Sequence, residues 1–313
     1  MAKPSIAVVM GGRSAEREIS LQTGGGVLRA LQSLGYDAWS LDYSDSFVDV
    51  LQHRRPDAVF NALHGGAGED GTVAALLEWL EIPYQGSGVR ASAIAMDKWT
   101  SKALMFVEQI PVARGVRLTY GEASQFDVAR NFGLPCVVKP VAEGSAVGVS
   151  LVRTPEDWQA ALRAAAPERG SDALLLIEEY IAGREFTVAV LGDEALPVVE
   201  ITPHDGFYTY FSKYTAGAST HTVPARIPAD VAEQMQQYGR RLHSALGCRD
   251  YSRSDMLLDS SGRIAVLECN TLPGLTPLSL FPDAARAAGI QYEDLVQRLI
   301  LCALARSRGS VTS

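Results

Sequence analysis

The sequence lacks a long hydrophobic run. No apolar segment approaches the ~18 residues that span a membrane. The first apolar run, residues 6–10, is too short for the core of a signal peptide and ends in glycines. We therefore expect a cytoplasmic protein that does not bind a membrane.

Positive charge and cysteine are also scarce. The chain has 28 Lys and Arg against 36 Asp and Glu, a net charge of -8 and a pI near 5.2. Nucleic-acid binding surfaces need clustered Lys and Arg, so this balance favours a small-molecule substrate over a nucleic acid. The cysteines form no C-x-x-C pattern, which argues against a zinc site or a redox pair. They are Cys136, Cys248, Cys269 and Cys302.

Two common nucleotide-binding motifs are missing. The chain contains no G-x-x-x-x-G-K-[ST] sequence, and no G-x-G-x-x-G follows the first predicted strand. A P-loop is therefore excluded, and a dinucleotide site of the usual kind is not expected. If the chain binds a nucleotide, it uses another type of site.

The chain nevertheless has enough apolar material for several cores. Its 313 residues, 47% of them hydrophobic, predict two or three domains. Residues 1–93 alternate predicted strands with helices, which indicates a parallel β-α-β sheet. The pattern of residues 94–183 predicts a small central α+β unit. The pattern of residues 184–313 predicts a C-terminal α+β unit. Strands are expected at 6–10, 38–41, 58–61, 82–84, 136–139, 149–152, 174–178, 187–191, 196–201 and 264–268, and helices at 73–80, 98–107, 158–165, 231–245 and 292–305.

The most informative segment is residues 252–270, where two apolar strands flank a Ser-Gly turn. If Ser261 and Gly262 form a two-residue hairpin loop, Asp255 lies opposite Glu268 and Arg253 lies opposite Asn270. All four side chains then share one face. An edge hairpin with a solvated polar face is the alternative, and a three-residue loop would shift this register.

The side chains on that face suggest a metal site. Asp255, Glu268 and Asn270 offer oxygen atoms without His or Cys, as Mg²⁺ prefers when it also holds phosphate. Two further segments could bind the nucleotide itself. Lys139 closes an apolar strand before the glycine loop 143–149, whose N–H groups can cover phosphates, although an ordinary hairpin turn looks the same. The strand 174–181 ends in two carboxylates that could face adenine or simply be exposed.

Together these segments resemble the D-alanine-D-alanine ligase family, and the resemblance covers nearly the whole chain in the right order. The matching segments are 11–20 (GGRSAEREIS), 64–71 (HGGAGEDG), 139–148 (KPVAEGSAVG), 207–214 (FYTYFSKY), 253–255 (RSD) and 268–276 (ECNTLPGLT). Two departures from the common pattern are Ala146, where a second serine is frequent, and Glu179, where a lysine often stands.

This resemblance implies an ATP-grasp architecture, in which ATP lies between the central and C-terminal units. It also implies roles for individual residues. The ATP phosphates would contact Lys98, Lys139, Lys213 and the loop with Ser145, and adenine and ribose would contact Glu178, Glu179, the main chain at Ile181 and Glu185. Two Mg²⁺ or Mn²⁺ ions would bind Asp255, Glu268 and Asn270. The substrate residues would be Glu16 for the ammonium of the first D-alanine, Ser279 and Leu280 for the carboxylate of the second, and His64.

The implied reaction joins two D-alanines to D-alanyl-D-alanine, a precursor for the peptidoglycan cell wall, through an acyl phosphate. Arg253 and the Gly274 N–H would stabilise the oxyanion, and Ser145 and Tyr214 would hydrogen-bond with Glu16 and keep a loop closed. A D-alanine-D-lactate or D-alanine-D-serine ligase is the nearest alternative, and a nucleotide-binding regulator without turnover is a more distant one. The resemblance also implies a homodimer.

Overall fold

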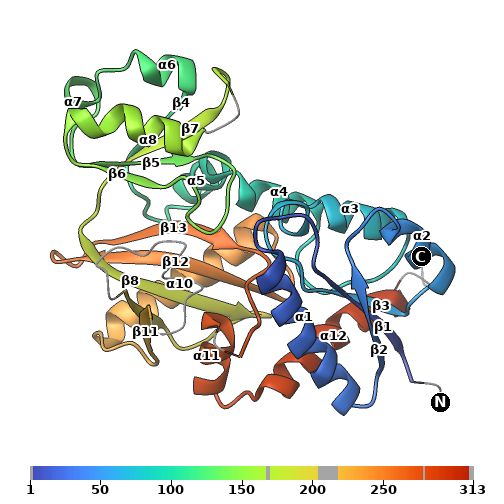
Figure 1. The fold of residues 1–313 in the computed structure, drawn as a ribbon. Helices are drawn as coiled ribbons and strands as arrows, with labels where there is room; N and C mark the ends of the chain where they lie inside the picture. The colour runs from blue at the N-terminus through green and yellow to red at the C-terminus, as the bar shows by residue number, and fades with distance from the viewer. Residues whose placement is uncertain (1–2, 167–169, 204–217, 278, 310–313) are drawn as a thin grey trace.

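The computed structural model describes residues 3–166, 170–203, 218–277 and 279–309, and these form three units that are each built on a β-sheet (Figure 1). One sheet is parallel and the other two are antiparallel, which confirms the α/β multi-domain class. The limits 1–93, 94–183 and 184–313 stay a prediction. Among the described residues, no helix combines the length and apolar character that a membrane crossing requires.

The N-terminal unit is a three-stranded parallel sheet in the order β2-β1-β3. Residues of β1 alternate between two apolar layers, because successive strand side chains point to opposite faces: Ile6 and Val8 pack in one layer, Ala7 and Val9 in the other. The strand expected at 82–84 is wrong, since only an isolated bridge joins Tyr84 to Val59 there. The elements are β1 (Ser5–Met10), α1 (Arg17–Ser33), β2 (Asp37–Asp42), α2 (Phe47–Arg54), β3 (Ala58–Asn61), η1 (Gly66–Gly68) and α3 (Thr72–Trp79).

The central unit is a four-stranded antiparallel sheet in the order β4-β7-β5-β6. Helix α8 covers one face, where Trp158 and Leu162 are buried against Val138 and Ile177. The expected glycine loop does connect two paired strands, β5 and β6. The elements are β4 (Gly115–Thr119), α6 (Tyr120–Ser124), α7 (Val128–Asn131), β5 (Cys136–Pro140), β6 (Ser150–Val152), η2 (Pro155–Asp157), α8 (Trp158–Ala165) and β7 (Leu174–Glu179).

The C-terminal unit contains a six-stranded antiparallel sheet, with β11-β10-β8-β12-β13 in order and β9 paired to β8. Helix α10 packs on one face of this sheet, where Met235 and Leu242 contact Val188 and Met256. The strand expected at 196–201 is displaced, because β10 begins at Val199. The elements are β8 (Gly183–Leu191), β9 (Glu194–Ala195), β10 (Val199–Pro203), β11 (Ser219–Thr222), α10 (Ala229–Leu246), β12 (Tyr251–Asp259), β13 (Ile264–Asn270), α11 (Leu280–Ala287) and α12 (Tyr292–Gly309).

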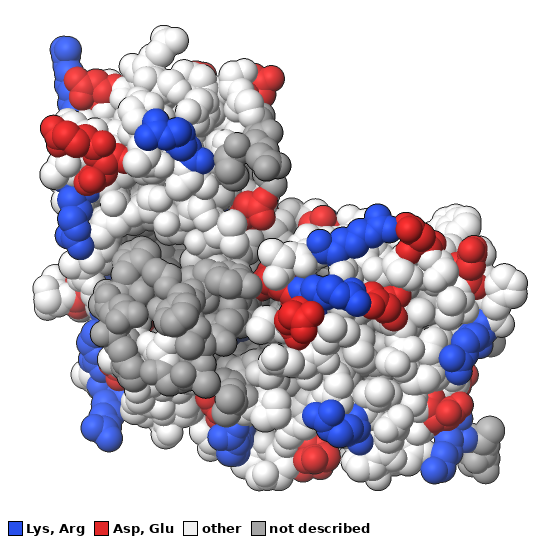
Figure 2. Space-filling view, in the orientation of Figure 1, with Lys and Arg blue, Asp and Glu red and all other residues white. Residues whose placement is uncertain are grey.

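Three helices connect one unit to another. Helices α4 (Val89–Met96) and α5 (Lys98–Val107) pack against α10 and β13 of the six-stranded sheet. Helix α12 packs against α1 and β3 of the N-terminal sheet, although it lies near the other end of the sequence (Figure 1). On the face drawn in Figure 2, acidic and basic side chains are interspersed over the described surface.

Candidate active site

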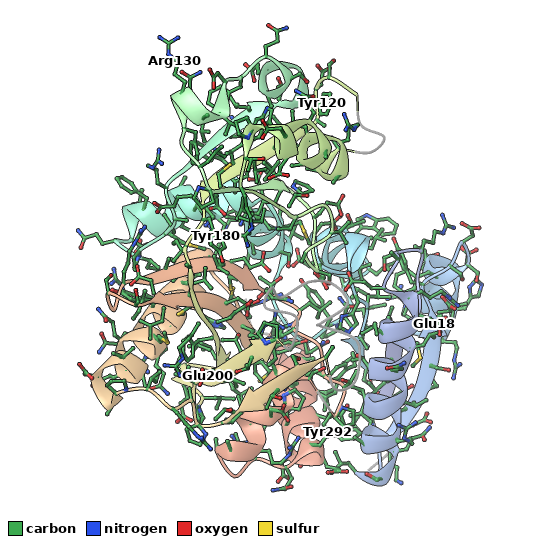
Figure 3. All side chains as sticks on the ribbon, turned by 60° about the vertical axis from the view of Figure 1, so that its left-hand side comes forward. Glu18, Tyr120, Arg130, Tyr180, Glu200 and Tyr292 are labelled. Carbon is green, nitrogen blue, oxygen red and sulfur yellow. The ribbon has the colours of Figure 1, made fainter. Side chains whose placement is uncertain are left out.

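A cavity of 390 Å³ lies between the four-stranded and six-stranded sheets. Tyr180 lies at the junction of these two sheets and Glu200 on the six-stranded one (Figure 3), and both line the cavity. Eight residues singled out from the sequence are on its walls, so the fold brings segments far apart in the chain to one place. They are Lys98, Lys139, Glu178, Glu179, Ile181, Glu185, Asp255 and Glu268.

One wall of the cavity is the β12–β13 hairpin, which has the expected register. Arg253 pairs with Asn270 and Asp255 with Glu268. The guanidinium of Arg253 donates to both carboxylate oxygens of Asp255 at 2.9 Å, and Thr187 on β8 donates to Oδ1 of the same group at 2.6 Å. This network fixes the carboxylate of Asp255 in a buried position at the cavity wall.

The expected two-residue loop of this hairpin is wrong. The Asp259 N–H bonds the Arg263 carbonyl, so three residues, Ser260 to Gly262, form the turn. Gly262 has φ +86°, a conformation that glycine adopts without strain. The longer loop shifts the register by one residue near the turn, where Met256 pairs with Val266. A bulge at Leu267 then shifts it back before Asp255, and the two deviations cancel at the residues of interest.

Lysines form ion pairs with two acidic groups of the cavity, Glu268 and Glu178. Lys98 Nζ lies 3.5 Å from Glu268 Oε2 and also donates to the Glu143 carbonyl in the glycine loop. Glu178 is buried and forms ion pairs with Lys139 and, at 2.6 Å, with Lys102. Burial alone would raise the pKa of the Glu178 carboxyl, but Lys139 and Lys102 together hold it below its ordinary value. Glu178 is therefore ionised at neutral pH.

Glu179 has a different environment from Glu178. Its carboxylate accepts from Arg263 at 2.6 Å and from the Arg114 N–H at 2.9 Å. Arg263 follows the β12–β13 turn, so this contact connects the end of β7 in the central sheet to the six-stranded sheet. The residue that departs from the common family pattern thus joins the two sides of the cavity.

The predicted substrate residues meet where the N-terminal unit approaches the other two. Glu16 is buried at the N-terminus of α1, and its Oε1 accepts from the Ser145 hydroxyl at 2.5 Å, which is the hydrogen bond expected from the resemblance. Ser145 and the following Ala146 have φ of +52° and +57°. His64 is also buried, and its Nε2 lies 3.0 Å from the Thr23 hydroxyl oxygen. Burial lowers the pKa of His64 to about 4, so the ring is uncharged at neutral pH.

Gly274 and Ser279 lie beside His64. A methyl group built on Gly274 would be 3.1 Å from His64 Cε1 and 3.2 Å from the Ser279 hydroxyl oxygen. Ser279 precedes the first residue of α11, Leu280. The N-terminus of a helix presents free N–H groups that favour a carboxylate. This corner can therefore hold an anionic group next to the hairpin.

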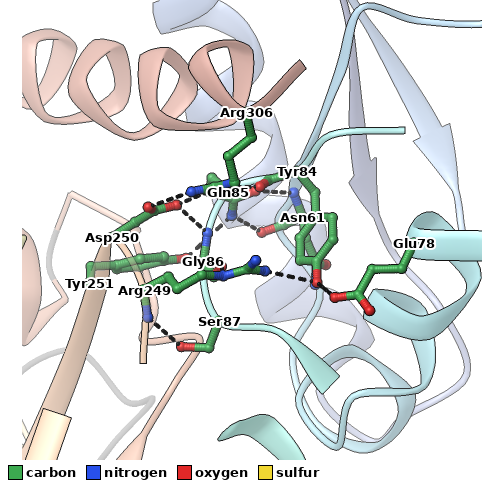
Figure 4. Close-up of polar contacts among 10 residues, drawn as sticks. All are labelled: Asn61, Glu78, Tyr84, Gln85, Gly86, Ser87, Arg249, Asp250, Tyr251 and Arg306. Atoms are coloured by element: carbon green, nitrogen blue, oxygen red, sulfur yellow. Dashed lines mark hydrogen bonds and ion pairs between the residues drawn. The ribbon is translucent and has the colours of Figure 1, made fainter. Parts of the chain in front are cut away.

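A polar network fixes the N-terminal unit against the six-stranded sheet (Figure 4). Arg306 of α12 donates to both carboxylate oxygens of Asp250, at 2.8 and 2.7 Å, and also to the Tyr84 carbonyl. Asp250 in turn accepts from the Gly86 N–H at 2.7 Å. Arg249 adds a bond to the Tyr84 hydroxyl at 2.9 Å. The network thus fixes the segment with Tyr84 and Gly86 of the N-terminal unit against the residues that precede β12.

Two predicted residues, Lys213 and Tyr214, lie outside the described residues.

Sequence analysis did not single out two residues of the cavity region, Lys102 and Thr187. Lys102 is four residues after Lys98 on α5 and so shares its helical face, which was a usable signal. Thr187 lies in an apolar strand, and no pattern in the sequence indicated its role.

A third missed residue, Glu69, belongs to the loop 64–71 that the sequence did single out. Burial and the nearby Glu16 raise the pKa of its carboxyl to about 7. This carboxyl therefore titrates near neutral pH, unlike that of Glu178.

Two family models match the chain. The model described as D-ala D-ala ligase N-terminus matches residues 42–87, and the one described as D-ala D-ala ligase C-terminus matches residues 99–301. The chain belongs to the D-alanine–D-alanine ligase family. The family model for the C-terminus covers the hairpin, the start of α11 and every cavity-lining residue except Lys98.

Members of this family are similar to the chain over nearly its whole length. The D-alanine–D-alanine ligase of Geobacter sulfurreducens is 45% identical over 305 residues, which is 97% of this chain and 95% of the relative. The D-alanine–D-alanine ligase B of Chromobacterium violaceum is 44% identical over 296 residues, 94% of this chain and 96% of the relative.

Solved structures of the family have the same fold. The D-alanine–D-alanine ligase from Bacillus anthracis complexed with ATP has a TM-score of 0.85 and 32% identity, over 98% of this chain and 99% of that one. A D-Ala:D-Ser ligase from Enterococcus faecalis has a TM-score of 0.81 and 29% identity, over 96% and 100% of the two chains. The fold is therefore common to ligases with different second substrates.

Proposed function

We propose that this chain uses ATP to join two D-alanines into D-alanyl-D-alanine, for the synthesis of cell-wall precursors. The observation that carries the proposal is the cavity wall in which Asp255 faces Glu268, with Arg253 beside them and Lys98 Nζ 3.5 Å from Glu268. This combination suits a phosphoryl-transfer site, because lysines and an arginine can offset the charge of phosphate groups. Membership in the ligase family supports the substrate.

ATP is proposed to occupy the cavity between the two sheets. The ligase from Bacillus anthracis, which has the same fold, has been solved with ATP. The glycine loop around Ser145 would cover the phosphates, and the apolar walls near Ile181 would take the adenine. The residues proposed for the phosphates are Lys98, Lys139, Lys213 and Ser145, and those for adenine and ribose are Glu178, Glu179, Ile181 and Glu185.

The residues present also fit two divalent cations, Mg²⁺ or Mn²⁺. Asp255 and Glu268 lie directly opposite each other on adjacent strands and both line the cavity, and with Asn270 they provide the oxygen donors that Mg²⁺ prefers. Within the described ranges no three His, Cys, Asp or Glu side chains gather to hold a metal, so ATP phosphates would have to complete the coordination. Bound Mg²⁺ would offset charge on those phosphates.

The chain's own residues would then serve two chemical steps. Lys98 and Lys139 would offset the charge that accumulates as the first D-alanine carboxylate attacks the γ-phosphorus and an acyl phosphate forms. Glu16, held by Ser145, would bind the ammonium of this D-alanine. The second amine would attack the acyl carbon, and Arg253 with the Gly274 N–H would stabilise the oxyanion until phosphate leaves.

The N-terminus of α11 is proposed to hold the carboxylate of the second D-alanine. Ser279 and the Leu280 N–H would bind it, and His64 would pack beside it. Tyr214 would close the site against water, because water would hydrolyse an acyl phosphate.

The test is ATP-dependent phosphate release with Mg²⁺ and D-alanine, with products identified by mass. D-alanine with D-lactate, D-alanine with D-serine, and L-alanine alone are run in parallel. We expect one molecule of dipeptide to form for each phosphate released. A mixed product would move the assignment to a ligase with another second substrate, and bound ATP without turnover on any mixture would indicate a nucleotide-binding regulator.

We also propose a cytoplasmic homodimer, on the family resemblance alone. Sedimentation equilibrium of the purified chain would give the mass of the assembly. A mass equal to one chain at micromolar concentration would contradict the dimer.

A further inference from the structure

In the proposed reaction, one proton has no assigned acceptor. The second D-alanine binds as an ammonium ion, which has no lone pair, and must lose a proton before its nitrogen can attack the acyl phosphate. Arg253 and the lysines of the cavity are cationic and cannot take this proton. A neutral or anionic group near the glycine loop and the N-terminus of α11 is required.

Glu69 occupies a suitable position. It follows η1, and its Oε1 accepts from the Gly65 N–H at 2.9 Å. A methyl group built on Gly144 of the glycine loop would lie 3.7 Å from Glu69 Oε2 and 4.0 Å from Glu16 Oε2. The carboxylates of Glu69 and Glu16 therefore face the same point of this loop, and the Glu69 side chain is only partly buried.

The charges around Glu69 come from three other elements. Glu16 at the start of α1 and Glu268 on β13 disfavour its ionised form, whereas Arg253 on β12 and the Gly65 N–H favour it. Among the described residues, no Lys or Arg forms an ion pair with Glu69. Its carboxyl therefore stays basic enough to accept a proton, in contrast to Glu178, which two lysines hold ionised.

Glu16 is already assigned to the ammonium of the first D-alanine. His64 is another residue here that could accept a proton, and it suits the task less well. Its pKa is lowered to about 4, whereas that of Glu69 is raised to about 7. A catalytic base works best when its pKa lies near the operating pH. His64 Nε2 also lies within hydrogen-bond distance of Thr23. The geometry and the neighbouring charges both favour Glu69.

We propose that Glu69 accepts the proton from the ammonium of the second D-alanine, an inference that rests on the proposed ligase function. One N–H bond breaks and one O–H bond forms on Glu69, which leaves a neutral amine. The nitrogen lone pair then forms the C–N bond to the acyl carbon. The C–O bond to phosphate breaks, and the second proton of the nitrogen leaves with the phosphate. No oxidant or further reactant is needed.

The test compares two nucleophiles at neutral pH. The ammonium of D-alanine must lose a proton to an acceptor before it can attack. Hydroxylamine is mostly uncharged at this pH, so it attacks the acyl phosphate without a proton acceptor and gives D-alanine hydroxamate. In Glu69→Gln the side chain keeps an oxygen for the Gly65 N–H but is a far weaker base. We expect this variant to lose about 100-fold or more in dipeptide formation and to keep hydroxamate formation near the wild-type rate.

Two further variants define the outcome. Glu69→Asp keeps a carboxylate and should restore part of the dipeptide rate. Glu233→Gln, on the exposed surface of α10, should match the wild type in both products. Equal loss of both products in Glu69→Gln, or loss of neither, would overturn the role of Glu69. A wild-type chain that forms neither product would instead overturn the ligase function itself.

Discussion

Replacing Glu69 by Gln is expected to stabilise the ligand-free protein at alkaline pH. Burial, followed by Glu16, raises the pKa of Glu69 from 4.5 to about 7. Below pH 4.5 both the folded and the unfolded chain hold this proton, so Glu69 costs nothing. As the pH rises to about 7 the unfolded chain releases the proton first, and stability falls. Glutamine, which does not ionise, avoids this loss.

The pKa difference sets the magnitude. The step from 4.5 to about 7 corresponds to about 3 kcal/mol. This is an upper value, because the partly exposed side chain allows water to screen its charge. At about 1.5 °C for each kcal/mol in a chain of 313 residues, the melting temperature of Glu69→Gln should exceed that of the wild type by a few degrees above neutral pH.

The assay is thermal unfolding of the ligand-free wild type and Glu69→Gln from mildly acidic to alkaline pH. The two melting temperatures should converge at the acidic end and separate as the pH rises through neutral. Glu233→Gln should follow the wild type throughout. A difference that is independent of pH, or a variant less stable at alkaline pH, would refute the reasoning about this carboxyl.

Other predictions concern the hairpin, the junction between units and α1. Arg253→Ala should lower turnover about 10²–10³-fold with little change in ATP affinity by calorimetry, and near-normal turnover would remove its oxyanion role. Arg306→Leu should cost about 3–5 kcal/mol in urea unfolding, because Asp250 is left buried without its cation. Adding Asp250→Asn should recover part of this loss, and no recovery would contradict the charge argument. Gly25→Ala should stabilise α1 by up to about 1 kcal/mol. Gly24→Ala should destabilise α1, because the added methyl group would lie 2.6 Å from Met10. Equal effects of the two substitutions on the free energy of unfolding would contradict this packing.

The β12–β13 hairpin shows how far sequence reasoning reaches. Alternation along two apolar strands predicted that Asp255 and Glu268 lie opposite each other, and they do. The loop length behind that prediction was wrong, and the bulge at Leu267 corrected the register. The two routes differ near the turn: without the bulge Val266 would share the face of Glu268, whereas in the structure it pairs with Met256 and packs in the core under α10. Ile264 to Leu267 are all apolar, so this stretch shows no polar alternation that would distinguish the two routes.

Contacts between units were beyond prediction from local patterns. The approach of Gly274 to His64, and of Glu69 to the glycine loop, depends on how three separate sheets pack together. The raised pKa of Glu69 and the lowered pKa of His64 follow from that packing, because burial is the main cause of both. The motifs identified the candidate residues, but their protonation states needed the assembled structure.

The packing of α12 on the N-terminal sheet has a consequence for the order of folding during synthesis. Ile6 and Val8 of β1 belong to the same apolar layer as Leu295 and Leu299 of α12. A ribosome makes β1 early but makes α12 after both other units. One side of the first sheet therefore lacks part of its cover for most of translation, and exposed apolar surface of this kind favours aggregation. We expect the nascent N-terminal unit to depend on chaperones until α12 emerges.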